Sequence, residues 1–101
     1  MISLYRVIEQ MRIRPEAFLR VRSVAAFDVW LDGYSLALRS AGIVDPERVD
    51  FDGFVEWLIV KHKIPRSPKA WYIGLQSFSG GDAAALDFLL SELAVYLSRK
   101  K

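Results

Sequence analysis

Hydrophobic residues recur at helical spacing along most of the chain, and proline, glycine or charged residues interrupt the pattern at intervals. The first such segment has Leu4, Ile8 and Met11 on one side, and Ser3 stands where a helix N-cap belongs. The spacing therefore predicts a helix over residues 4–13.

The clearest pattern covers residues 23–41. Its polar positions follow i, i+4, i+7 and i+11, the repeat of one helix face: Asp28, Asp32, Ser35 and Arg39. Large apolar residues take the opposite face: Phe27, Trp30, Leu31, Tyr34 and Leu38. Gly42 then supplies a C-terminal stop. The pair Asp32-Gly33, a hairpin signal in other contexts, is thus expected inside a helix.

Gly33 should destabilise that helix by about 1 kcal/mol relative to alanine. It lies on a strip of small residues with Ala26, Ala37 and Ser40. We expect another helix backbone to approach closely along this strip, because only small side chains leave room for such a contact.

The same dipeptide returns as Asp52-Gly53. Asp50 or Asp52 can cap a helix that continues to His62, with Gly53 in its first turn. Residues 54–60 are a short apolar run with β-branched residues, so a buried strand is the alternative there. We favour the helix.

Three prolines mark further helix starts, since proline fits the first turn of a helix: Pro15, Pro46 and Pro68. The third predicts a short helix over residues 68–78, with Trp71, Leu75 and Phe78 on one face. The last helix is expected over residues 82–99 with its leucines inward. The pattern indicates an all-α fold, a single compact domain of about five helices over residues 1–101.

Composition agrees with a folded domain and excludes several kinds of protein. The 101 residues are 52% hydrophobic and 26% charged, unlike a disordered segment. There is no cysteine, which excludes disulfides, zinc–thiolate sites and thiol catalysis. No signal peptide or segment long enough to span a bilayer is visible. We therefore expect a cytoplasmic protein with no membrane partner.

Charge is distributed unevenly along the chain. The first 22 residues carry a net +3, residues 23–56 a net −5, and residues 57–101 a net +4. The acids of the middle segment predict a surface that attracts a basic protein partner, and four of them are the expected contacts: Asp45, Asp50, Asp52 and Glu56. Helix capping and pairing with the chain's own basic ends is the alternative explanation of these acids.

A basic loop precedes the helix expected at Pro68. It contributes four cations: Lys61, Lys63, Arg66 and Lys69. With Ser67 at the start of a helix, this loop could hold a phosphate of a nucleic acid or another ligand. We consider a nucleic acid the less favoured partner, because the aromatic residues fall at core spacing and do not alternate with the basic ones.

The sequence offers little for catalysis. His62 has no cysteine or second histidine to share a metal, and we expect it to interact with the end of its own helix. Asp28 and Asp32 lie one helical turn apart and could act as an acid pair, but a solvated helix stripe explains them as well. We predict a non-enzymatic protein without metal or cofactor.

Several residues together resemble a family of small, mostly uncharacterised bacterial helical proteins. The resemblance rests on Arg14-Pro15, on Leu31-Asp32-Gly33-Tyr34, on Trp57 and Trp71, and on Phe88-Leu89-Leu90, and it spans nearly the whole chain. Residues 16–20 depart from the family pattern because they lack its glycine. Some proteins of this family are suspected immunity proteins, so the resemblance implies an inhibitor that binds a toxin.

Aromatic residues leave self-association open. Four of them could lie in the core or in a homodimer interface: Trp30, Tyr34, Trp57 and Trp71.

Overall fold

A computed structural model describes residues 3–99, which form six helices and no strand. The helices are α1 (Leu4–Ile13), α2 (Pro15–Leu19), α3 (Val24–Ser40), α4 (Pro46–His62), α5 (Ile73–Ser79) and α6 (Asp82–Ser98). The predicted all-α class is confirmed. The expected number of about five is one too few, because residues 15–19 form a separate helix of one turn. No helix in the described part of the chain is long and apolar enough to cross a bilayer.

Capping side chains set the start of α1, as the sequence predicted, and also the start of α3. Ser3 accepts a hydrogen bond from the Arg6 N–H at 3.3 Å, and Ser23 accepts one from the Ala26 N–H at 3.0 Å. Gly42, with φ of +69°, follows the end of α3. Asp32-Gly33 therefore lies inside a helix, as expected.

The packing role predicted for Gly33 is wrong. A Cβ atom built on Gly33 meets nothing within 4 Å, and Gly33, Ala37 and Ser40 all lie exposed. Only Ala26, near the start of α3, packs against the core. The strip of small residues therefore faces solvent, and no contact offsets the low helix propensity of Gly33.

The predicted cap of α4 is also wrong. The helix begins at Pro46, one residue after Asp45, whose carboxylate accepts the Glu47 N–H at 3.0 Å. Asp50, Asp52 and Gly53 consequently lie within the helix. Residues 54–60 are helical, which decides between the two alternatives for this run. α4 is a continuous helix because Asp45 and Pro46 already provide a complete start.

Pro15 and Pro46 begin helices, but Pro68 does not. The segment between His62 and Ile73 is a loop in which Ser67 accepts a hydrogen bond from the Lys69 N–H at 3.2 Å. α5 begins only at Ile73 and is held against this loop at Gly74. A Cβ there would come within 2.0 Å of the Pro65 carbonyl oxygen, so the position requires glycine.

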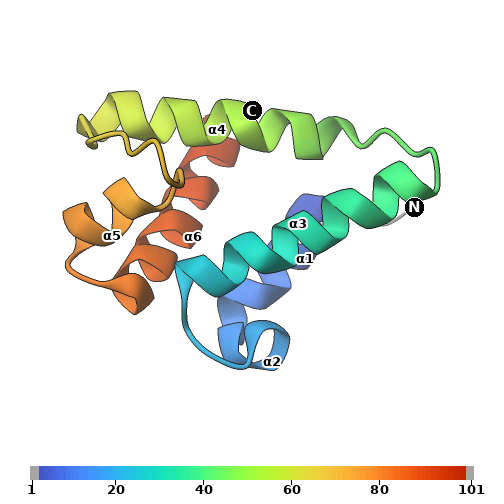
Figure 1. Cartoon of the computed structure of the whole chain (residues 1–101), viewed down its shortest axis with the longest axis horizontal. Coiled ribbons are helices and arrows are strands. Elements are labelled where there is room, and N and C mark those ends of the chain that lie inside the picture. Colours follow the sequence, from blue (N-terminus) through green and yellow to red (C-terminus); the bar gives the residue numbers. More distant parts are fainter. Residues whose placement is uncertain (1–2, 100–101) are drawn as a thin grey trace.

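The six helices enclose one hydrophobic core (Figure 1). α4 runs along the top of the view, α2 lies at its lower edge, and α5 and α6 occupy one side. The buried leucines predicted for the last helix are confirmed at Leu86, Leu89, Leu90 and Leu93. The four aromatic residues left open by the sequence, Trp30, Tyr34, Trp57 and Trp71, are partly buried against this core.

Gly33 and Gly42 should respond in opposite directions to replacement by alanine. Gly33→Ala should stabilise the protein by about 0.5–1 kcal/mol, because the added methyl group meets no obstacle and alanine has the higher helix propensity. Gly42→Ala should destabilise it by a similar or larger amount, because alanine does not favour a φ of +69°. Urea unfolding of both variants measures these changes, and a destabilised Gly33→Ala would mean that the strip is covered after all.

Candidate functional site

Asp45 is an internal structural residue. It is only 8% exposed, caps α4 through one oxygen, and accepts the Tyr34 hydroxyl at 2.6 Å through the other. Burial and this hydrogen bond to a carboxylate raise the pKa of Tyr34 to about 12. Asp45 therefore ties the start of α4 to α3.

Asp50 is likewise directed inward. Its carboxylate accepts the Tyr5 hydroxyl from α1 at 2.5 Å and the Tyr96 hydroxyl from α6 at 3.2 Å. Burial and the bond to Asp50 raise the pKa of Tyr5 above its ordinary value. Glu47, one turn earlier, accepts the Ser3 hydroxyl at 2.6 Å and the Tyr5 N–H at 3.1 Å. These acids join α4 to its neighbours.

Asp52 and Glu56 point outward, and each forms an ion pair with an arginine. Asp52 accepts from the Arg48 guanidinium at 2.9 Å, and Glu56 accepts two bonds from Arg66 at 2.9 and 2.5 Å. The hydrogen bond from Arg66 lowers the pKa of Glu56 against the opposing effect of desolvation, and the positive charge of Arg66 adds to the lowering. The four predicted contacts therefore do not form one open acidic patch, since two are internal and two are exposed but paired.

The exposed acids lie on a helix face that also carries exposed valines. This outer face of α4 comprises Val49, Asp52, Glu56 and Val60, which recur at i, i+3, i+7 and i+11. It runs into a hollow of about 300 Å³ where α3 turns into α4. The hollow has apolar walls from Leu38, Ile43, Val44 and Val49, and charged edges from Arg39, Arg48, Asp45 and Asp52.

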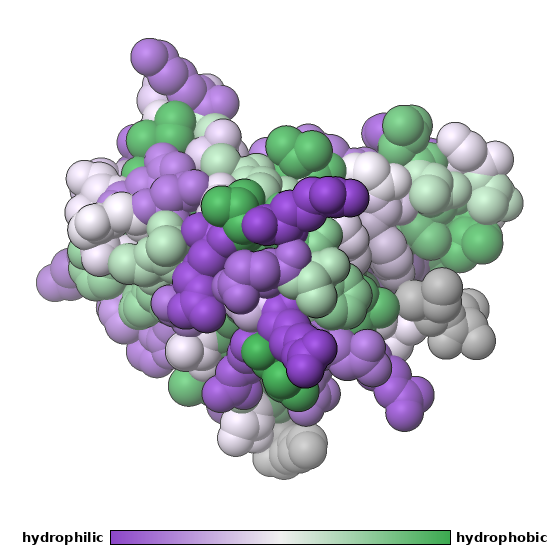
Figure 2. All heavy atoms as spheres, turned by 90° about the horizontal axis from the view of Figure 1, so that it is seen from below, coloured by the Kyte–Doolittle hydropathy of each residue, from purple (hydrophilic) through white to green (hydrophobic). Residues whose placement is uncertain are grey.

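We call the outer face of α4 and this hollow together the α3–α4 surface. Val44 is 79% exposed and Val49 is 65% exposed, so large aliphatic side chains stand in water here. In Figure 2 hydrophobic side chains gather at the end of the molecule where α3 turns into α4. Sequence reasoning missed this surface, because it treated the acids without the aliphatic residues of the 43–49 segment beside them.

The basic loop lacks the helix start that the predicted phosphate site was expected to use. No helix begins at Ser67, so no free helix N–H groups face the cations. Lys61 lies 3.3 Å from a Glu92 oxygen and 4.6 Å from the centre of the Trp57 ring, and Arg66 is held by Glu56. Lys63 and Lys69 are exposed. Two of the four predicted cations are thus engaged within the fold.

Asp28 and Asp32 are not brought together with other reactive groups. Asp28 accepts the indole N–H of Trp71 at 2.7 Å, which fixes the loop before α5 against α3. Asp32 is exposed. Neither residue lines the hollow just described or the groove described next.

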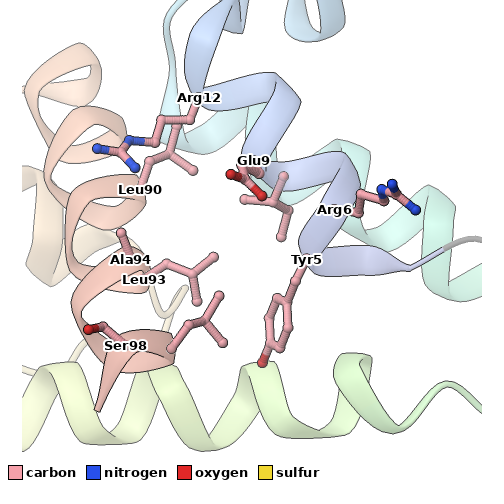
Figure 3. Close-up of a pocket in the computed structure, with 10 residues that line it drawn as sticks. Tyr5, Arg6, Glu9, Arg12, Leu90, Leu93, Ala94 and Ser98 are labelled. Atoms are coloured by element: carbon pink, nitrogen blue, oxygen red, sulfur yellow. The ribbon is translucent and has the colours of Figure 1, made fainter. Parts of the chain in front are cut away.

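The groove lies between α1 and α6 and has a volume of about 400 Å³ (Figure 3). Its lining is about half apolar and half polar. The apolar part comes from Ile8, Leu90, Leu93, Ala94 and Leu97, and the polar part from Tyr5, Arg6, Glu9, Arg12 and Ser98. Tyr5 points toward α4 and Arg6 points away from α6, while Glu9 faces the groove and Arg12 reaches toward α6. The groove therefore offers a mixed apolar and polar surface, with a carboxylate and guanidinium groups among its lining residues.

His62 makes a specific contact that the sequence did not predict. Its Nε2 bonds to Glu92 of α6, and its ring packs against Phe78 and Phe88 with centroids 5.7 and 5.0 Å away. Burial alone would raise the pKa of Glu92, but hydrogen bonds from His62 and Lys61 outweigh it and lower that pKa. The described residues contain no group of three or more His, Asp or Glu side chains placed to hold a metal ion.

Comparison with known proteins gives no match: no protein-family model, no curated protein and no solved structure is significantly similar to this chain.

Glu92→Gln should lower the free energy of unfolding by about 1–3 kcal/mol at pH 7, because a buried carboxylate loses charge-assisted bonds to His62 and Lys61. A carboxyl whose folded pKa lies below its unfolded value, about 4.3, stabilises the fold above that value and ceases to do so as the pH falls through the folded pKa. The difference between wild type and variant should therefore shrink below about pH 4. Chemical unfolding from pH 3 to 7 measures it, and a difference that is constant over this range would contradict the role of the charge.

Proposed function

We propose that this protein is a non-enzymatic binding module that acts stoichiometrically on a basic partner protein through the α3–α4 surface. One observation carries the proposal: exposed aliphatic side chains, Val44 and Val49 above all, adjoin exposed carboxylates on one helix and a hollow. An apolar centre with a charged rim is the composition of protein interfaces.

The internal ion pairs do not prevent Asp52 and Glu56 from meeting such a partner. The Glu56–Arg66 pair is exposed on both sides, and in the Asp52–Arg48 pair the carboxylate is exposed while Arg48 is partly buried. Pairs at the surface contribute only about 0–1 kcal/mol. A lysine or arginine of the partner can replace Arg48 or Arg66 at little cost. Asp45 and Asp50, by contrast, would have to abandon their tyrosines, so we assign them to the support of the surface and not to contact.

The resemblance to small bacterial helical proteins makes a toxin the first class of partner to test. A protein that occludes a basic active site needs a rigid apolar surface with acids beside it and no chemistry of its own. In this proposal the protein acts in the cytoplasm, as an immunity protein or related inhibitor.

A nucleic-acid or phosphate-binding regulator is the second hypothesis, and less of the structure supports it. Its proposed site was Lys61, Lys63, Arg66 and Lys69 at a helix start, and that helix start is absent while two of the cations are paired.

The proposal is tested by capture of partners from lysate of the source cells, with nuclease treatment, followed by titration of the purified partner. Asp52→Lys/Glu56→Lys should weaken the complex about tenfold or more and reduce its dependence on salt. Val44→Ser/Val49→Ser should weaken it by removing apolar contact, with Val95→Ser as a control at another exposed valine.

Glu9→Lys/Asp87→Lys is the matched control for charge, because it changes the net charge by the same amount on α1 and α6. If both double lysine variants weaken the complex equally, the weakening is explained by net charge alone, which would contradict the proposed surface. Loss of the captured partner on nuclease treatment would favour the basic loop.

A further inference from the structure

A second mixed surface lies on the other side of the molecule, around α2. We call it the arginine corner, and its members are all exposed: Arg12, Ile13, Arg14, Phe18, Arg20 and Val21. Ile13 is 78% exposed and Val21 is 53% exposed, so this corner places large aliphatic side chains in water. Figure 2 looks at the molecule from the side of α2 and shows long hydrophilic side chains interleaved with hydrophobic ones.

Within residues 3–99, three arginines of this corner form no ion pair. In the described part of the chain no carboxylate lies within 4 Å of Arg12, Arg14 or Arg20. The nearby acids are already engaged, because Arg22 bonds to Glu16 at 3.2 Å and to Asp87 at 3.1 Å. The corner therefore carries an excess of positive charge that the fold does not neutralise.

The backbone holds these side chains outward. α2 is anchored by Pro15 and Leu19, which are its buried residues, and it ends at Arg20 in a left-handed conformation with φ of +66°. Arg14 connects α1 directly to α2. With the buried positions already filled by Pro15 and Leu19, the exposed apolar residues cannot turn into the core without displacing them.

We propose that the arginine corner binds the surface of a bilayer that contains anionic phospholipids. Arginine pairs with phosphate through two parallel hydrogen bonds, and apolar side chains between the arginines can enter the boundary between headgroups and acyl chains. The corner projects from the molecule at α2, and of its members only Arg12 lines the groove between α1 and α6. A bilayer accommodates a projecting surface of this kind, whereas a peptide segment is usually received in a groove or at a sheet edge.

This contact is peripheral and needs no membrane-spanning helix. The sequence led us to expect no membrane partner only because it contains no segment that could span a bilayer. It also goes beyond the proposed protein-binding function and does not depend on it. α4 and α2 lie on opposite sides of the molecule (Figure 1). When this protein is bound to a bilayer through α2, α4 is therefore free to bind a partner protein.

Sedimentation with phospholipid vesicles tests the proposal on the full chain. We expect binding to vesicles of phosphatidylcholine with phosphatidylglycerol and little binding to phosphatidylcholine alone. Arg12→Gln/Arg14→Gln/Arg20→Gln should lower the partition coefficient about 100-fold, since each arginine near an anionic surface contributes about a factor of five. Ile13→Ser/Val21→Ser should lower it about tenfold, and both effects should exceed those of matched controls.

The charge control is Arg39→Gln/Lys63→Gln/Lys69→Gln, which removes three exposed cations elsewhere and, like the test variant, includes one residue with positive φ. The apolar control is Val44→Ser/Val60→Ser. Circular dichroism checks that each variant is folded.

Three results would overturn the proposal. One is the absence of binding to the anionic vesicles. Another is equal loss of binding in the test and control triple variants, which would reduce the effect to net charge. The third is full binding by Ile13→Ser/Val21→Ser together with equal competition by soluble polyglutamate, which would assign the corner to an acidic protein segment.

Discussion

The position of α4 depends on carboxylates that accept hydrogen bonds from three other helices. Asp50 alone receives hydroxyl groups from α1 and α6, and Asp45 receives one from α3. At the C-terminal end of α4 the roles are reversed, because the carboxylate of Glu92 belongs to α6 and its partners, Lys61 and His62, belong to α4. The apolar core drives collapse but has little direction, whereas these bonds specify which side of α4 faces inward.

That orientation decides what α4 presents to solvent. With Asp45 and Asp50 turned inward, the exposed positions are left to Val49, Asp52, Glu56 and Val60, and the hollow at the α3–α4 turn adjoins them. The negative charge that the sequence places in residues 23–56 is thereby divided between internal anchoring and an exposed face. The positive charge at the two ends is divided as well, because Arg22 and Arg66 bind acids of the fold while the arginines around α2 do not.

Local signals in the sequence were sufficient for most of the fold. Ser3, Ser23, Pro15 and Pro46 mark helix starts through interactions with neighbouring residues, and the periodic segments gave the buried leucines of α6. The error at Pro68 arose where distant contacts decide. Pro68 stands in a loop fixed by Gly74 and by the Trp71–Asp28 bond, and neither contact has a local signature.

The candidate site was less predictable for the same reason. Five acids within residues 45–56 indicate an acidic surface only if all of them face solvent, and the tyrosines that bind two of them come from positions 5, 34 and 96. Sequence alone does not say which acids those tyrosines reach. It likewise gives no reason to expect exposed valines beside the remaining acids, since apolar residues are ordinarily assigned to the core.

The division of acids into inner anchors and outer contacts is tested most directly by Asp50→Ala and Asp52→Ala. Both change the same residue type in the same helix, so differences in helix propensity cancel. We expect Asp50→Ala to lower the free energy of unfolding by about 2–4 kcal/mol, because two part-buried tyrosine hydroxyls lose a charged acceptor, and Asp52→Ala to change it by less than about 0.5 kcal/mol. Equal and small changes in urea unfolding would contradict the structural role assigned to Asp50.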